Sequence, residues 1–148
     1  MDVFVANEQA EVDLDAQRFV TLARVASEEE GVDPNAELSV LFLDRTAMAS
    51  LKERYLGEGG PTDVLAFPMD EGPGDEMPFL LGDIVICPDV AREQADEAGA
   101  TVAEELDLLF VHGFLHLIGY DHVRPQDAKA MRHRERKILQ EFNRGGER

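Results

Sequence analysis

Hydrophobic positions recur with two different periods along the chain, and the two periods alternate. Short runs rich in β-branched and other apolar residues predict four strands, at 2–7, 37–44, 64–68 and 79–88. Longer stretches with apolar residues every three or four positions predict helices at 12–29, 46–55, 88–98, 101–119 and 125–142. Strands interleaved with helices in this way predict a single α+β or α/β domain, in which the helices surround a small four-stranded sheet.

The stretch 101–119 is the most apolar part of the chain. Thr101 and Glu104 fit a capping box at its start, and Gly119 is a typical helix terminator at its end. Apolar side chains surround the helix on nearly all sides between these points, so we expect it to lie in the middle of the fold. The strand at 79–88 is also apolar almost throughout, which predicts burial on both of its faces.

The composition agrees with one folded domain. Of 148 residues, 44% are hydrophobic, so we expect a single domain over 1–148, with only 143–148 frayed. No apolar run approaches the roughly 18–20 residues of a membrane span, and the start of the chain lacks the features of a signal peptide. The single cysteine, Cys87, excludes an internal disulfide and is expected to be a buried strand residue. Together these features favour a cytoplasmic protein that does not associate with membranes.

The net charge of −17 is distributed unevenly. Residues 124–148 contain eight lysines and arginines against four acids, a net charge of +4, whereas residues 1–123 carry −21. A cationic last helix can bind an anionic partner, although such a charge run is more often a solvated helix face. The acidity of the rest of the chain disfavours nucleic-acid binding there, because phosphates bind to cations.

Three of the four histidines lie in the apolar segment HGFLHLIGYDH, residues 112–122. His112 and His116 are four residues apart, so they occupy one face of the predicted helix, with Cβ atoms about 5–6 Å apart. Gly119 can adopt a positive φ and reverse the chain, which lets His122 turn back toward the other two. Three core histidines are the alternative, but each would need its own hydrogen-bond partner in an apolar setting. The spacing therefore predicts that His112, His116 and His122 bind one metal ion.

A site with three protein ligands leaves the fourth tetrahedral position open, which is typical of a catalytic zinc site. Zinc suits imidazole ligands, although nickel, copper and iron are alternatives. In His-Glu-x-x-His metallopeptidases a glutamate base follows the first histidine, whereas this chain has Gly113 there. Asp121 and Asp83 are the candidate acids for orienting a ligand or transferring a proton, unless they serve only local turns. His133, in the polar last helix, is expected to be solvated.

Three segments of the sequence resemble one known family. HGFLHLIGYDH resembles the signature of the YbeY family of bacterial metal-dependent endoribonucleases and ribosomal RNA maturation factors. GPTDVLAFPMDE at 60–71 and LGDIVICPDVAREQA at 81–95 resemble two further segments of that family, in the same order and spacing. The resemblance implies a small, mostly parallel sheet flanked by helices, with the metal in a cleft at the end of the central helix.

The resemblance also implies a function. It implies one zinc ion held by His112, His116 and His122, and hydrolytic cleavage of single-stranded RNA during maturation of the 3′ end of small-subunit ribosomal RNA. It further implies a role in ribosome quality control, with ribosomal RNA, ribosomes and ribosomal proteins as partners. The catalytic residues are then the three histidines, with Asp121 beside them.

The chain departs from the family at one position that concerns substrate binding. Many members have an arginine directly after the tyrosine that matches Tyr55, where this chain has Leu56. Arginines of the last helix are expected to bind the substrate phosphates in its place, and residues at the matching strand entry are expected to line the substrate groove. The candidate substrate-binding residues are Thr62, Asp63, Arg132 and Arg136.

Two other functions fit the same histidines. A three-histidine metal site also serves peptidases and amidases, although Gly113 removes the usual base. In the second alternative the chain is a non-catalytic ribosome assembly factor whose metal stabilises the fold. Its acidic surface then docks on basic ribosomal proteins.

Overall fold

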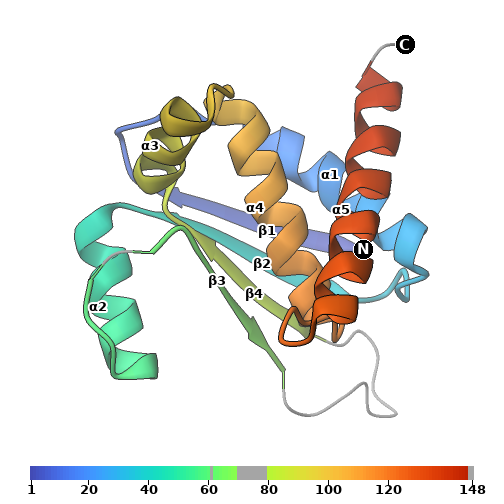
Figure 1. The fold of residues 1–148 in the computed structure, drawn as a ribbon, viewed down its shortest axis with the longest axis horizontal. Coiled ribbons are helices and arrows are strands. Elements are labelled where there is room, and N and C mark those ends of the chain that lie inside the picture. The colour runs from blue at the N-terminus through green and yellow to red at the C-terminus, as the bar shows by residue number, and fades with distance from the viewer. Residues whose placement is uncertain (61, 70–79, 147–148) are drawn as a thin grey trace.

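The computed structural model describes residues 1–60, 62–69 and 80–146, which form the strands and helices labelled in Figure 1. The strands are β1 (Asp2–Glu8), β2 (Glu37–Leu43), β3 (Val64–Pro68) and β4 (Leu80–Ile86). The helices are α1 (Ala16–Glu30), α2 (Arg45–Leu56), α3 (Pro88–Ala98), α4 (Val102–Leu117) and α5 (Pro125–Gly146). Every predicted element is present in the described ranges, which confirms the α+β class.

The strands form one mixed sheet in the order β1-β2-β4-β3. β1 pairs with β2 and β2 with β4 in parallel, whereas β3 pairs antiparallel with β4 at the edge. Gly82 lies where β3 and β4 meet, and its φ is +149°. A Cβ at Gly82 would lie 2.5 Å from the carbonyl oxygen of Phe67, so the close approach of the two strands requires glycine. The mostly parallel sheet implied by the resemblance is therefore confirmed.

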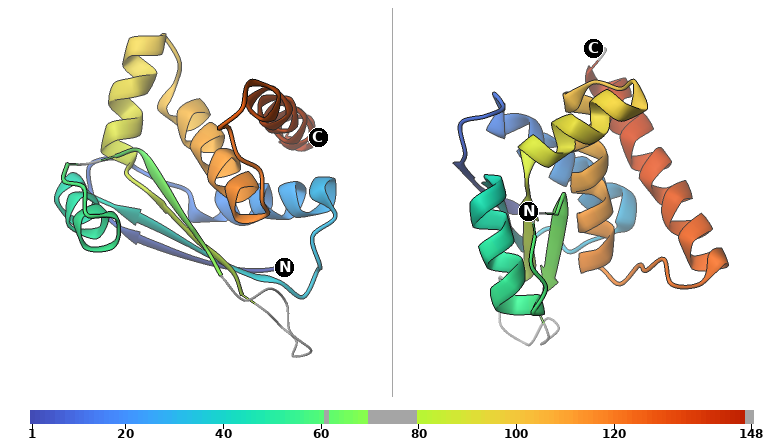
Figure 2. Two further views of the ribbon diagram at one scale, coloured as in Figure 1. Left: turned by 60° about the horizontal axis from the view of Figure 1, so that its bottom comes forward. Right: turned by 60° about the vertical axis from the view of Figure 1, so that its left-hand side comes forward.

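Helices cover the two faces of the sheet unequally (Figure 2). α4 lies across one face, in contact with α1 and α5, and α2 packs against the opposite face. Successive residues at the end of β4 point to opposite faces of the sheet. Ile84 and Ile86 lie in the core beneath α4, whereas Val85, and Cys87 just after the strand, pack against α2. The predicted central position of α4 is confirmed. No described helix is both long and apolar enough to cross a membrane.

The burial of β4 differs from the prediction at the start of the strand. Leu80 and Asp83 are exposed, and burial on both faces begins only at Ile84. α2 leaves part of its sheet face uncovered, so the Asp83 side chain lines a hollow together with Tyr55 and Phe67. Burial on both faces is therefore wrong for the first half of this strand, and residue 79 lies outside the described residues.

The bounds of three helices also differ from the predicted ranges. α1 begins at Ala16 and not at residue 12, because the Asp15 side chain caps it by accepting from the Gln17 N–H. α4 ends at Leu117, and Gly119 belongs to the turn that follows. α5 continues to Gly146, so residues 143–146 are helical, and 147–148 lie outside the described residues. The capping box at the start of α4 is confirmed, because Thr101 and Glu104 exchange their two hydrogen bonds at 3.0 and 3.1 Å.

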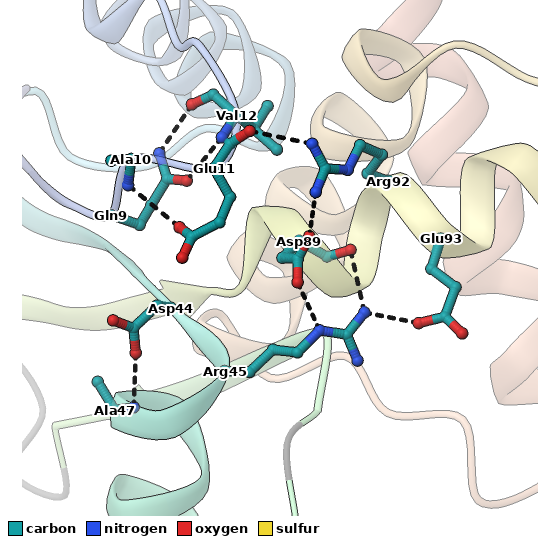
Figure 3. Close-up of polar contacts among 10 residues, drawn as sticks. All are labelled: Gln9, Ala10, Glu11, Val12, Asp44, Arg45, Ala47, Asp89, Arg92 and Glu93. Carbon is teal, nitrogen blue, oxygen red and sulfur yellow. Dashed lines mark hydrogen bonds and ion pairs between the residues drawn. The ribbon is translucent and has the colours of Figure 1, made fainter.

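Charged side chains join α2 to α3 on the outside of the molecule (Figure 3). Arg45, the first residue of α2, donates to Asp89 and to Glu93 of α3, each at 2.6 Å. Arg92 also contacts Asp89 and donates to the carbonyl oxygen of Glu11 at 3.0 Å. The hydrogen bond from Arg45, followed by that from Arg92, holds the pKa of the Asp89 carboxyl below its usual range. Exposed pairs of this kind are individually weak, so the network mainly orients α2 against α3.

Candidate metal centre

The three histidines of the signature come together around the carboxyl-terminal half of α4. His112 and His116 lie one turn apart on this helix, and their Nε2 atoms are 3.1 Å apart. The ring centroid of His122, in the following loop, is 5.5 Å from that of His112 and 5.1 Å from that of His116. One ring nitrogen from each residue lies within 4.8 Å of the other two. Two nitrogens bound to one tetrahedral zinc ion are about 3.3 Å apart, so small side-chain rotations bring all three onto one ion.

A glycine turn returns His122 to the end of α4. Gly119 has a φ of +106°, which residues with a Cβ rarely adopt. The Gly119 N–H donates to the carbonyl oxygen of His116 at 3.1 Å, and the Tyr120 N–H donates to that of Leu115 at 3.0 Å. The reversal predicted from this glycine is confirmed, and it places the third histidine beside the first two.

A buried carboxylate from α5 orients the first histidine. Oε2 of Glu135 lies 2.7 Å from Nδ1 of His112, and Glu135 is only 7% exposed. With the proton on Nδ1, the imidazole donates to this carboxylate and turns its Nε2 lone pair toward the other two histidines. Sequence reasoning missed Glu135. The available signal was an acid at helical spacing with the core residues Met131 and Ile138, on the apolar face of the last helix.

Burial and neighbouring imidazoles both act on His116. Burial lowers the pKa of its ring below the ordinary value, and the nearby His112 and His122 lower it further. The neutral imidazole is the form that binds a metal ion. These two effects favour the neutral His116 ring, the form that can bind a metal ion, at neutral pH.

A second buried carboxylate anchors the loop that carries His122. The side chain of Glu30, at the end of α1, is 4% exposed and accepts a hydrogen bond of 2.7 Å from Nε of Arg134. The Tyr120 hydroxyl lies beside both groups, and its pKa is raised by burial and by a hydrogen bond with Glu30. Tyr120 is two residues before His122, so this contact restrains the loop. The neighbouring residues Arg134 and Glu135 of α5 thus hold two sides of the histidine cluster.

A cleft of about 620 Å³ opens beside the histidines. β3 and α4 supply its mainly apolar walls, and Asp63 stands at the start of β3. The Asp63 carboxylate accepts from the N–H of Val64 at 2.7 Å and from Gln94 at 3.2 Å. Among the described residues Asp63 lines this cleft and Thr62 does not; the Thr62 hydroxyl lies 3.5 Å from the Asp63 carboxylate.

The other acids singled out in the sequence lie elsewhere. Asp121 is exposed and accepts from the N–H of Val123 at 3.2 Å, which is a local turn contact. It lines a separate hollow with Arg124 and Asp127. Asp83 lies on the sheet face covered by α2, opposite the histidines.

Gly113 faces the sheet. A Cβ at this position would lie 3.0 Å from Cγ2 of Ile84 and 3.4 Å from Cγ2 of Val64. A glutamate base, as in His-Glu-x-x-His peptidases, therefore has no room here. The glycine in the signature has a packing reason.

The remaining candidate residues divide between the two sides of the molecule. Arg132 lines a small cavity together with His112 and His122, and Arg136 lies one turn further along α5. Leu56, at the end of α2, is exposed on the opposite side of the sheet. His133 is exposed as expected, and Cys87 is buried against α2. Among the described residues, neither His133 nor Cys87 joins the metal-binding group.

Comparisons with known proteins agree with the geometry. The family model described as endoribonuclease YbeY matches residues 4–143. A relative from Salinispora tropica with that name is 50% identical over 141 residues, covering 88% of this chain and 89% of the relative. A second from Beutenbergia cavernae, with the same name, is 49% identical over 147 residues, covering 96% and 97%.

A solved structure shares the fold. The solution structure of TM1509 from Thermotoga maritima superposes with a TM-score of 0.65 at 26% sequence identity, covering 95% of this chain and 88% of that chain. The family match spans nearly all of the described elements and contains the three histidines. This chain therefore belongs to the YbeY endoribonuclease family.

Proposed function

We propose that this chain is a zinc-dependent hydrolase that cleaves single-stranded RNA and acts in maturation of the 3′ end of small-subunit ribosomal RNA. The observation that carries the proposal is the convergence of His112, His116 and His122 within 4.8 Å in a chain of this family. The relatives' name, endoribonuclease, supplies the RNA substrate. A role in ribosome quality control, ribosomal-protein partners and a cytoplasmic location belong to the same proposal and rest on the family resemblance.

The donor set suits zinc, because three imidazoles leave one tetrahedral position free. When bound, zinc supplies a Lewis acid for a phosphoryl oxygen and lowers the pKa of the attacking water to about 7. The protein itself orients the histidine rings and sets which of their nitrogens carry protons. Glu135 holds the His112 ring in one tautomer, and burial keeps His116 neutral. Asp121, the residue before His122, stays the proposed proton-transfer residue. Its carboxylate accepts from the Val123 N–H and lines a separate hollow, so proton transfer requires this side chain to turn toward the histidines.

The cleft beside the histidines is the proposed substrate groove. Its volume of about 620 Å³ lies within the range of roughly 300–1,000 Å³ that small-ligand sites occupy, so it accommodates a nucleotide. Asp63 stands in this groove, where its carboxylate can accept a hydrogen bond from an exocyclic amino group of a base. Thr62 is proposed to support Asp63, its neighbour.

The proposal is tested by cleavage of a labelled single-stranded RNA with zinc-loaded protein, run beside His116→Ala and a labelled peptide. We expect the wild type to cut the RNA, His116→Ala to lose activity, and the peptide to stay intact. Circular dichroism and bound-zinc measurements on His116→Ala separate loss of the ligand from loss of the fold.

The other outcomes identify the rival functions. Cleavage of the peptide and not the RNA indicates a peptidase or amidase. Equal RNA cleavage by both proteins indicates a contaminating nuclease. No cleavage, with a melting temperature that falls when zinc is removed, indicates a structural metal in an assembly factor.

A further inference from the structure

The cations of the last helix divide into two groups. Arg124, just before α5, pairs with Asp127 at 2.8 Å, and Arg134 pairs with Glu30. Further along, Lys137 and Arg144 both pair with Glu141, at 3.3 and 3.2 Å. Three other cations of α5 have no ion-pair partner among the described residues: Lys129, Arg132 and Arg136. We call these three residues the α5 cationic stripe.

The α5 cationic stripe occupies one exposed face of the helix. Its members are three and four residues apart, so they line up along the helix over about 10 Å. All three are exposed, whereas Met131 and Ile138 on the opposite face lie in the core. Unpaired cations gathered on one face are a distinct feature in a chain with a net charge of −17, in which acids outnumber cations more than twofold.

The stripe is continuous with the metal centre. Arg132 lines a cavity of about 310 Å³ together with His112, His122 and Glu135. On the outer side of α5, Lys129 and Arg136 line a second hollow of about 480 Å³. The α5 cationic stripe therefore extends from the histidines, at Arg132, to the solvent-exposed face of α5, at Lys129 and Arg136. The other side of the centre is the mainly apolar cleft containing Asp63, which has no cationic side chain among its described lining residues.

We propose that the α5 cationic stripe binds the sugar-phosphate backbone of single-stranded RNA on one side of the cleaved bond. This inference rests on the proposed nuclease function and specifies how an acidic protein holds a polyanion. The acidic remainder of the surface repels the strand, so the backbone follows the α5 cationic stripe. In the part of the chain that the structure describes, this stripe is the one exposed run of unpaired cations that reaches the histidines. An acidic protein segment has the same charge, but the wall that Arg132 shares with His112 and His122 favours the substrate itself.

The test compares two double variants of the full-length, zinc-loaded protein. Lys129→Gln/Arg136→Gln removes two cations of the stripe, and Lys137→Gln/Arg144→Gln removes two paired cations of the same helix. Both change the net charge equally, and glutamine is a good helix former. The control leaves Glu141 without its partners, so nonspecific repulsion of RNA is at least as strong in the control.

The readout is the salt dependence of binding. The probe is a fluorescent single-stranded 2′-O-methyl phosphorothioate oligonucleotide, which resists hydrolysis and keeps its backbone charge. Each phosphate contact contributes about 0.7 to the slope of log K against log salt for single strands, so losing two lowers the slope by about 1.4. We expect this decrease, with a weaker Kd, in the stripe variant, and a slope equal to wild type in the control. The KM for RNA cleavage should rise in the stripe variant alone.

Two results overturn the inference, and each is distinguishable from failure of the nuclease proposal. If wild type cleaves RNA but both double variants bind the probe alike, the stripe does not hold the strand. If polyglutamate binds to wild type with a slope that the stripe variant loses, while the RNA slope is unchanged, the stripe serves an acidic protein. A wild type that neither binds nor cleaves RNA contradicts the nuclease proposal itself.

Discussion

The carboxylate of Glu135 lies 2.7 Å from Nδ1 of His112, across the contact between α4 and α5. Because Glu135 is buried, water screens its charge only weakly. The His112 imidazole is its partner. The orientation of the His112 ring therefore depends on the docking of the last helix. The histidine cluster is held from outside α4 as well as by its own spacing.

Glu135→Gln should weaken zinc binding. The amide oxygen can still accept from His112, but it carries no negative charge to raise the basicity of the ligand. Changes to such supporting residues typically cost about 10–100-fold in metal affinity, and we expect a loss in that range. Competition with a chromophoric chelator measures it.

Glu141→Gln is the matched control, because Glu141 lies on the same helix and pairs only with Lys137 and Arg144 among the described residues. Its zinc affinity should equal that of wild type. Equal affinities for Glu135→Gln and wild type would show that the carboxylate serves the packing of α5 and not the metal.

Tyr120→Phe should loosen the loop that carries His122. The substitution removes the hydroxyl from the buried pair of Glu30 and Arg134 and leaves Glu30 with one partner fewer. We expect unfolding of the metal-free protein by urea to become easier by about 1–3 kcal/mol, and zinc affinity to fall as well. Tyr55→Phe is the control, because Tyr55 is 61% exposed and lies on the other side of the sheet. A loss of stability without a change in zinc affinity would leave Tyr120 a structural role only.

The three histidines could be predicted from the sequence because their relation is local. His112 and His116 share a helix face by spacing alone, and one glycine turn brings His122 back. The spacing of Glu135 with core residues of α5 indicates its burial, but the contacts of Glu135 and Glu30 with the site could not be predicted, because they arise only through the packing of α5 and α1. Their roles depend on how distant helices dock, which the period of apolar residues does not specify.

The sequence also could not predict on which face of the sheet Asp83 lies. An apolar run hides the alternation of a strand, so the sequence did not show which side each residue of β4 faces. The observed pairing places Asp83 opposite Phe67 and Ser39, on the side of α2. The exposure of Asp83 depends on where α2 packs on this face of the sheet and on how much of the face it covers.

Neutralising either of two adjacent glutamates at the start of α4 should change the stability of the protein, in opposite directions for Glu104 and Glu105. Burial, and then the nearby Asp63, raise the pKa of Glu105, so the folded protein keeps this proton to higher pH than the unfolded chain. This raised pKa lowers the free energy of unfolding at high pH. The loss is absent below the pKa of the unfolded chain, about 4.3, grows as pH rises through the pKa of the folded protein, and is complete above it. Glu105→Gln should therefore raise stability at pH 7 by about 0.5 kcal/mol, and the gain should vanish near pH 4.

Glu104→Gln provides the opposite sign. The backbone N–H of Thr101 donates to Glu104 and lowers its pKa, so the charged form is favoured in the folded state. That stabilisation is present above the unfolded pKa and is lost as pH falls through the folded one. Urea unfolding at pH 7 should show Glu104→Gln less stable than wild type. Equal shifts of one sign for both variants would mean that net charge, and not local environment, controls them.

Gly113→Glu tests why this family site lacks the peptidase base. Overpacking against Ile84 and burial of a carboxylate without a partner each cost about 1–3 kcal/mol. Their sum is a large part of the roughly 5–15 kcal/mol that stabilises a domain. We therefore expect a sharply lower melting temperature and no peptide cleavage. Leu108→Glu, at the half-exposed position on the same helix, should cost much less. A Gly113→Glu protein with wild-type stability that cut peptides would show that the site can place a base there, and would return the peptidase function to consideration.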